Sequence, residues 1–471
     1  MDVSWAWLAS VPPTASGRTR GIGESIAAPP SIRGATSRGV RDLRPFSAGD
    51  GMGEEQGALE AERYPPGYEI GELPMSATTL EQDQADAEGP ASPPEDQAAS
   101  LARLRGFHPG WFGAVMGTAI VGVAASMNPG GIAALAQPAR TLGQTMVVLS
   151  AVLAIVLGTG YVGRFLWHRD AALADFRDPV VGALFGTVPG GILVLAAAAA
   201  AVGPTWFPSS TVHDLVAGFD WVGIPLAFAM SVLFAYLLFV RSEVVPETVN
   251  GGWFIPPVVN IVVPLVLVPL VPSASPAVAR ALLLTSYGFW GMAFLLYLLV
   301  VVMLHHRLVL HSLPHASLAP SLWIGLGPIG VGALALVKLA SVGGGACGRA
   351  EPAVATLSKL AATALWGFGV WWLAAAVLLL VHYLRSGPLP YGLGWWGFTF
   401  PLGAYTVATL ALARSWSLVG LDWAGGVLFV LLGLFWLVVA GRTTWAVRTG
   451  EAFKASSTGP TTPAADQAGP R

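Results

Sequence analysis

The sequence carries little charge for its length. Only 11% of its 471 residues are Asp, Glu, Lys or Arg, against about 25% in ordinary soluble proteins. Hydrophobic residues make up 54% and the mean hydropathy is +0.63, which indicates a membrane protein rather than a soluble enzyme. The net charge of −2 provides no electrostatic attraction to nucleic acid, so no nucleic-acid partner is expected.

Cysteine and lysine are scarce, and each scarcity excludes a kind of site. The single cysteine, Cys347, excludes an intramolecular disulfide and a cysteine metal cluster. The three lysines are Lys338, Lys359 and Lys454, and none of them follows a glycine. A Walker phosphate loop ends in Gly-Lys-Ser/Thr. The chain therefore does not drive transport with an ATP site of its own.

Two further patterns do not support a cofactor or a metal. Gly-x-Gly-x-x-Gly occurs at 325–330 and 392–397, but within or at the start of long apolar segments, whereas dinucleotide binding needs a strand before it and a soluble helix after it. Four histidines share one predicted loop without carboxylates or cysteine at ligand spacing: His305, His306, His311 and His315. We interpret them as a solvated interfacial loop, and we expect no cofactor and no metal.

The first hundred residues differ from the rest of the chain. They are rich in Arg, Ser, Gly and Pro up to Arg44, and from Asp50 to Asp96 they carry thirteen acids and one base. Because this composition cannot bury enough apolar surface, residues 1–100 are predicted to be disordered. The alternative is a start further downstream, at Met52 or Met75. The Ser/Thr/Pro/Gly-rich segment 450–471 is also predicted to be disordered, which leaves 101–449 as a transmembrane domain.

This domain contains ten segments of membrane-spanning length, which predicts an all-α integral membrane protein. They are 111–128, 142–166, 179–201, 217–240, 254–272, 281–304, 317–341, 357–383, 392–413 and 423–441. The predicted loops on the side of the N-terminus carry eleven Lys and Arg, and the opposite loops carry five. Both termini are therefore expected in the cytoplasm of a multi-pass protein of the plasma or inner membrane.

Odd-numbered and even-numbered spans differ in composition. The third, fifth, seventh and ninth contain Pro189, Pro264, Pro328 and Pro401, and the first contains several glycines. A proline in a helix interior costs about 3 kcal/mol, and in a bilayer it is tolerated where the helix faces protein or a water-filled cavity. We therefore expect the spans to form five hairpins, with the odd members as an inner ring around a central pathway.

Polar groups within the spans are few. Lys338 is the most interior charge, about 12 Å from the centre of its span. It is interpreted either as a lysine that extends to the headgroups or as an anion attractor at the pore mouth. Asp220 and Asp422 lie near predicted span ends, as helix caps. Without a deep charge, anions would depend on helix dipoles, backbone N–H groups and hydroxyls such as Thr118 and Thr187.

Three motifs resemble the tellurite-resistance/dicarboxylate transporter family, which includes malic acid transporters, sulfite exporters and plant slow-type anion channels. They are FHPGWFGAVMGT at 107–118, DPVVGALFGT at 178–187 and WWGFTFPLG at 395–403. The resemblance covers about 107–445. It implies ten helices in five hairpins, a pore lined by the inner five and a homotrimer. It also implies a gating phenylalanine on the ninth helix, which corresponds to Phe400.

The resulting hypothesis is a membrane transporter or channel for a small anion, with lipid around it. The substrate would be a C4-dicarboxylate such as malate, or chloride, nitrate or sulfite, with sulfite/tellurite-type efflux as the alternative. The hinge and pore-lining candidates are Gly117, Thr118, Gly186, Thr187, Pro189, Pro264, Pro328 and Pro401. A membrane-embedded enzyme is disfavoured, since we find no paired carboxylates at one depth, no His-x-x-x-His pair and no nucleophile motif. A receptor that uses residues 1–100 to bind a partner is a third reading.

Overall fold

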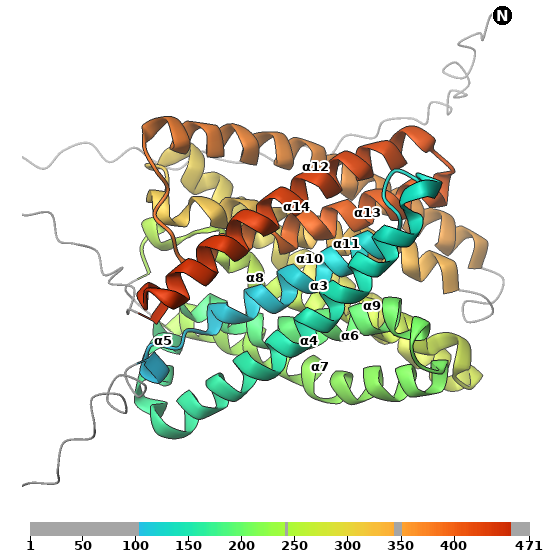
Figure 1. The fold of residues 1–471 in the computed structure, drawn as a ribbon, viewed down its shortest axis with the longest axis horizontal. Helices are drawn as coiled ribbons and strands as arrows, with labels where there is room; N and C mark the ends of the chain where they lie inside the picture. Colours follow the sequence, from blue (N-terminus) through green and yellow to red (C-terminus); the bar gives the residue numbers. More distant parts are fainter. Residues whose placement is uncertain (1–102, 241–243, 343–350, 454–471) are drawn as a thin grey trace, which may run out of the picture. The chain divides into compact units, whose positions relative to one another are not determined.

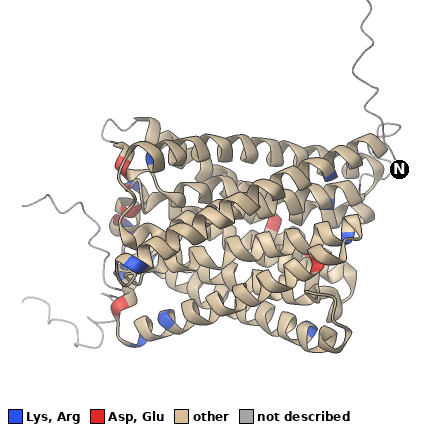
Figure 2. Cartoon of the chain, turned by 90° about the horizontal axis from the view of Figure 1, so that it is seen from above, with Lys and Arg blue, Asp and Glu red and all other residues tan. Residues whose placement is uncertain are grey.

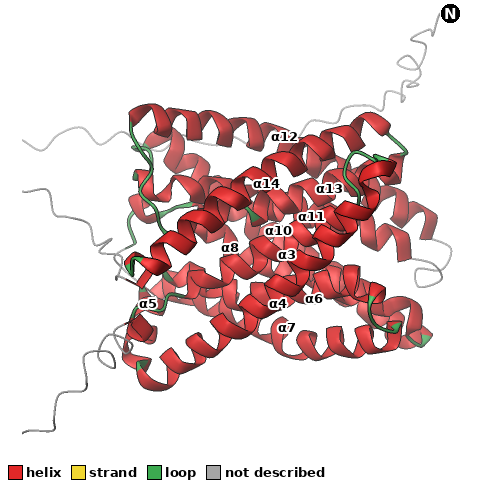
Figure 3. Ribbon diagram, viewed as in Figure 1, coloured by secondary structure: helices red, strands yellow, loops and turns green. Residues whose placement is uncertain are grey.

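The computed structural model describes residues 103–240, 244–342 and 351–453. Their secondary structure consists of helices joined by short loops, without a strand in this part of the chain (Figure 3). The predicted disorder of residues 1–100 and 454–471 lies outside these ranges. Residues 450–453 are described and end in the short 3-10 helix η11 (Glu451–Phe453).

Ten helical segments of the described chain are long and apolar enough to cross a membrane, which confirms the predicted fold class. They are Pro109–Ser126, Ala133–Trp167, Gly182–Thr205, Ser209–Val240, Gly251–Ser273, Pro276–Leu310, Ala316–Val342, Glu351–Ser386, Leu393–Trp416 and Val419–Arg448. Lys, Arg, Asp and Glu gather towards the two ends of the helices, and the stretches between them are almost free of charge (Figure 2).

Odd and even spans form an inner and an outer ring, as the proline pattern predicts. In the odd spans, 61–94% of the most apolar window is buried, against 17–22% in the even spans. The even spans are α4 (Ala136–Trp167), α7 (Ser209–Val240), α10 (Pro276–Leu310), α12 (Glu351–Ser386) and α14 (Val419–Arg448). In Figure 1, α7 and α12 lie at opposite edges of the view, with α3 and α11 between them. The outer helices expose large apolar side chains, as lipid-facing helices do.

Each inner span begins as a 3-10 helix and continues as an α-helix. The pairs are η1 (Pro109–Trp111) with α3 (Phe112–Ser126), η3 (Gly182–Gly186) with α6 (Thr187–Val202), η6 (Gly251–Phe254) with α8 (Ile255–Ile261), η8 (Ala316–Gly325) with α11 (Leu326–Val342), and η10 (Leu393–Phe398) with α13 (Phe400–Trp416). The third of these inner spans continues through α9 (Val263–Leu267) and η7 (Val268–Ser273).

This joint changes the interpretation of the prolines. Pro189, Pro328 and Pro401 lie in the first turn of the α-helical part of their spans, whereas Pro264 lies in the first turn of α9, directly after α8 ends at Ile261. The N–H groups of a first turn have no intrahelical acceptor, so a proline there removes no hydrogen bond. The prolines are interior to the spans, as predicted. Pro189, Pro328 and Pro401 start an α-helix after a 3-10 segment, so the helix-interior cost assumed from the sequence does not apply to them. Pro264 instead lies at a break between two α-helices.

The inner ring is closed. Helix α3 packs against α6 and α13, α13 against α11, α11 against α8, and α8 against α6. Glycines make two of these approaches possible. A Cβ atom at Gly251 would overlap the carbonyl oxygen of Ser321, and one at Gly330 would overlap the backbone of Tyr405. Small residues at these points let neighbouring backbones come close together.

Candidate functional site

A cavity of about 850 Å³ lies at the centre of the inner ring. All five inner spans line it, each through its C-terminal part. The lining includes Ile120 and Val123 of α3, Val194 and Ala197 of α6, Leu265 of α9, Val331 and Leu334 of α11, and Phe400, Ala404 and Val407 of α13. The odd spans start on the face that carries the described ends of the chain. The cavity therefore occupies the half of the membrane domain towards the opposite face.

Phe400 lies at the deep end of this cavity. It is the first residue of α13, and the other lining residues of this helix run from Ala404 to Arg414 and Ser415 at its far end. At 1.5 Å per residue, Phe400 and Arg414 are separated by about 21 Å along the helix. The cavity therefore has a depth of about two-thirds of a bilayer core.

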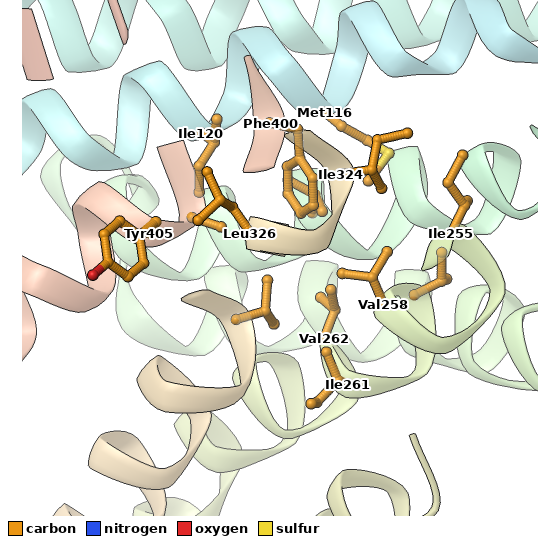
Figure 4. Close-up of a cluster of buried hydrophobic side chains, with 14 of the residues drawn as sticks. Met116, Ile120, Ile255, Val258, Ile261, Val262, Ile324, Leu326, Phe400 and Tyr405 are labelled. Atoms are coloured by element: carbon orange, nitrogen blue, oxygen red, sulfur yellow. The ribbon is translucent and has the colours of Figure 1, made fainter. Parts of the chain in front are cut away.

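The Phe400 side chain is 6% exposed and lies among residues of other inner spans. Figure 4 shows its ring beside Met116 and Ile120 of α3, Ile324 and Leu326 of the seventh span, and Val258 of α8. A Cβ atom built at Gly327 would lie 3.8 Å from Phe400 Cε1. Because residue 327 is a glycine, no side-chain carbon contacts this edge of the ring, and the ring has more room on the side of α11.

Three cations line the outer part of the cavity: Lys338 of α11, Lys359 of α12 and Arg414 of α13. Lys338 and Arg414 are exposed and Lys359 is partly buried. The Arg414 Nη2 group donates a hydrogen bond to the carbonyl oxygen of Met127, which fixes the guanidinium between α13 and the end of α3. The described lining contains no Asp or Glu, so the local field at the mouth is positive.

The predicted hydroxyls have partners away from the cavity. Thr118 is fully buried and accepts a hydrogen bond from Trp436 Nε1 of the outer helix α14, at 3.1 Å. The Thr187 hydroxyl lies 2.7 Å from the carbonyl oxygens of Pro109 and Leu184. These groups join helices of the ring to their neighbours, and neither is among the lining residues of the described cavity.

The predicted hinge residues lie at contacts between inner spans. A Cβ atom at Gly117 would overlap Thr399 Oγ1, and one at Gly186 would lie 3.0 Å from Ile255 Cγ2. Both glycines, and the prolines at 189, 264, 328 and 401, are buried, and none of them is in the described lining of the cavity. Pro401 directly follows Phe400 and is the closest of them to the deep end.

The described ends of the chain meet at the face opposite the mouth. Phe453 stacks on Trp111, with ring centroids 5.7 Å apart, and Trp111 stacks on Phe107 at the same separation. Close by, Arg164 pairs with Asp175 of α5 (Arg169–Arg177), with Nη2 and Oδ2 2.7 Å apart, and its Nε donates to the Arg105 carbonyl. These contacts attach the start of the first span to α4, α5 and the C-terminal segment.

His108 caps η1 at this face. Its Nδ1 accepts a hydrogen bond of 3.0 Å from the Gly110 N–H. Burial lowers the pKa of His108 to about 4, with Arg164 acting in the same direction and Asp175 and Asp178 in the other. The imidazole is therefore neutral near pH 7 and serves as a structural acceptor.

Sequence reasoning missed three charged residues that bear on this site. Lys359 and Arg414 were counted only as loop charges, although they share the face of Lys338. Asp220 was assigned to a helix end. Helix α7 begins at Ser209, so Asp220 lies about three turns inside it, with a 7% exposed side chain. The polar residues Ser209, Ser210 and Thr211 were the available signal for the earlier start.

Known proteins resemble this chain over most of its length. A family model described as voltage-dependent anion channel matches residues 106–444. An uncharacterized transporter of Methanocaldococcus jannaschii is 32% identical over 354 residues, which is 74% of this chain and 96% of the relative. A sulfite efflux pump of Arthroderma otae is 26% identical, covering 74% of this chain and 93% of the pump. A malic acid transport protein of Schizosaccharomyces pombe is 21% identical, covering 72% and 77%. The chain therefore belongs to the voltage-dependent anion channel family, the transporter family that its motifs at 107–118 and 395–403 resemble.

Proposed function

We propose that this chain passes small anions through the centre of its inner ring, with Phe400 as the gate. The observation that carries the proposal is the cavity itself. All five inner spans line it, three cations surround its outer part, and Phe400 lies at its deep end. The family and its named transporters support transport rather than catalysis as the general activity.

The lining favours anions by charge. Lys338, Lys359 and Arg414 raise the local anion concentration at the mouth, because a cleft lined by one sign of charge concentrates the opposite ion. Below them the wall is formed mainly by alanine, valine and leucine. An anion in this region would not be held by a fixed counter-charge, which favours weak binding and rapid passage.

Two substrate classes follow from the named relatives. One relative exports sulfite and another transports malic acid, so we propose either a small inorganic anion, including sulfite in efflux, or a C4-dicarboxylate. The weakly polar wall below the mouth favours the smaller, singly charged candidates, since a dicarboxylate would lose more hydration there. We further propose a plasma or inner membrane location with cytoplasmic termini, and assembly as a homotrimer.

The gate is tested by flux through proteoliposomes. We expect Phe400→Ala to raise chloride flux several-fold, because it removes the ring at the deep end of the cavity. Phe289→Ala is the matched control, since Phe289 lies on the outer helix α10 and packs on Phe228 of α7. Flux that is unchanged in Phe400→Ala, or raised equally by both substitutions, would contradict the gate.

A current measurement separates the substrate and the mode of transport. Planar bilayers with chloride, nitrate and malate gradients give the permeability order of a channel directly. Uptake of labelled sulfite or malate into liposomes without a steady current would instead indicate a carrier.

A further inference from the structure

One carboxyl group is buried within the membrane domain without a partner. Asp220 of α7 is 7% exposed, and neither of its side-chain oxygens has a hydrogen-bond partner among the described residues. An unpaired carboxylate is costly in an apolar region, whereas a protonated carboxyl loses far less. A group that persists in this position is therefore a candidate for binding and releasing a proton.

The surroundings of Asp220 supply no counter-charge. The elements packed on α7 are α6, α8, α9, η3 and η4 (Gly203–Thr205), and none of them contains a titratable residue. On α7 itself the nearest titratable residues are His213, which contacts Ser273 Oγ, and the exposed Asp214. The neighbouring α10 contributes Arg280 and Tyr287 at its outer half, which bond to the Pro276 carbonyl and to Ser358.

Asp220 lies behind the wall of the central cavity. It belongs to the buried stripe of α7, in which Val216 and Gly223 are its neighbours. A Cβ atom at Gly223 would lie 2.7 Å from Leu193 Cδ2 of α6, so this stripe packs on α6. The same helix contributes Val194 and Ala197 to the cavity, and Ala197, four residues after Leu193, lies on the side of α6 that packs on α7. Asp220 is thus separated from the cavity by no more than about one helix diameter, roughly 10 Å.

We propose that Asp220 is a proton-binding site that sets anion permeation, an inference that rests on the proposed function. When Asp220 is protonated, the wall behind α6 is neutral and anions enter the cavity. When it is ionised, its negative charge repels them. At about 10 Å and an effective dielectric constant of about 20, one charge lowers anion occupancy by on the order of tenfold.

The first test is the pH dependence of chloride flux through proteoliposomes of the full chain. We expect wild-type flux to fall by on the order of tenfold as the pH rises through the titration of Asp220. Asp220→Asn stays at the high, acid-pH level throughout, and Asp214→Asn, the exposed acid on the same helix, follows the wild type. A wild-type flux that does not fall with pH, or an Asp220→Asn profile that matches it, overturns the proposal.

The second test observes the proton without using flux. Every carboxyl that titrates between acid and alkaline pH adds a C=O band to the infrared difference spectrum, so Asp220 is identified by the component that the wild type and Asp214→Asn share and that Asp220→Asn lacks. A difference spectrum of Asp220→Asn that is identical to that of the wild type overturns the proton site. If the wild type passes no anion at all, the proposed function fails and the link to permeation fails with it, whereas the band still decides whether Asp220 binds a proton.

Discussion

The three cations around the cavity mouth allow a quantitative test of anion attraction. We consider the replacement of Lys338, Lys359 and Arg414 by methionine, singly and together. Methionine keeps an unbranched side chain of similar length and removes the charge, so it changes the field more than the packing. The described cavity lining contains these three cations and no acidic residue, so each substitution removes positive charge from the lining.

The expected size follows from the geometry of the ring. Five packed helices whose axes are about 9 Å apart lie about 8 Å from the axis of their ring. At that distance one charge contributes about 0.5 kcal/mol to an anion in water, which is about a twofold change in its occupancy. Lys338 and Arg414 lie on helices of this ring, whereas Lys359 lies on the outer helix α12 and should have a smaller effect. Removal of one ring cation should therefore lower the entry rate about twofold, and removal of all three by up to about tenfold, in solutions of low ionic strength.

Salt provides the signature that separates charge from packing. The screening length is about 30 Å at 0.01 M and about 8 Å at 0.15 M ionic strength, so at a distance of about 8 Å the energy at the higher salt is about half of that at the lower salt. Initial rates of chloride efflux at both ionic strengths measure the effect. Arg280→Met is the control, since Arg280 is exposed at the same face but lies on the outer helix α10, outside the cavity lining. An effect of equal size at both salt concentrations, or in Arg280→Met, would refute the electrostatic reasoning.

Two further predictions concern stability. Gly251→Ala places a Cβ atom against the Ser321 carbonyl oxygen, so we expect a destabilisation of about 1–3 kcal/mol from overpacking and a lower melting temperature in detergent. The control is Gly288→Ala on α10, where a Cβ atom would meet no atom within 4 Å and the melting temperature should not change. An equal effect of both substitutions would contradict the close approach of Gly251 to Ser321. For His108, burial lowers the pKa to about 4 in the folded chain, against about 6.5 when unfolded. The unfolded state then binds more protons between these two values, so stability is full above about pH 6.5 and is lost as the pH falls towards 4. His108→Asn keeps an acceptor for the Gly110 N–H, and its melting temperature should fall less steeply over this window; parallel curves for the two proteins would contradict the assignment.

The arrangement in an inner and an outer ring could be predicted because single residues, the interior prolines, distinguish the two kinds of helix. Interior prolines such as Pro328 and Pro401 occur in four of the five odd spans, whereas among the even spans only the fourth has one, Pro225, and a chain with this bias has two kinds of helix. The 3-10 segments before them were not predictable, because the sequence shows the proline but not the tighter winding that precedes it. The prolines therefore indicated the correct helices for a partly incorrect reason.

The charges around the cavity were less accessible to sequence reasoning. Lys338 was singled out because it lies within an apolar segment, whereas Arg414 lies at a segment end, where a charge is ordinary. The mouth emerges only when α11, α12 and α13 are placed side by side. For Asp220 the difficulty was local, since hydropathy placed the start of its span at 217 and the helix begins at Ser209. An error of two turns in a boundary turned a buried acid into an apparent cap.

The joint between η10 and α13 has a mechanical consequence for Phe400. A 3-10 helix turns about 120° and rises about 2.0 Å per residue, whereas an α-helix turns about 100° and rises about 1.5 Å. Each residue that moves from one winding to the other rotates everything beyond it by about 20° and shifts it by only about 0.5 Å. A change of winding at this joint would therefore rotate the Phe400 ring by a large angle, while the length of the span across the membrane would hardly change.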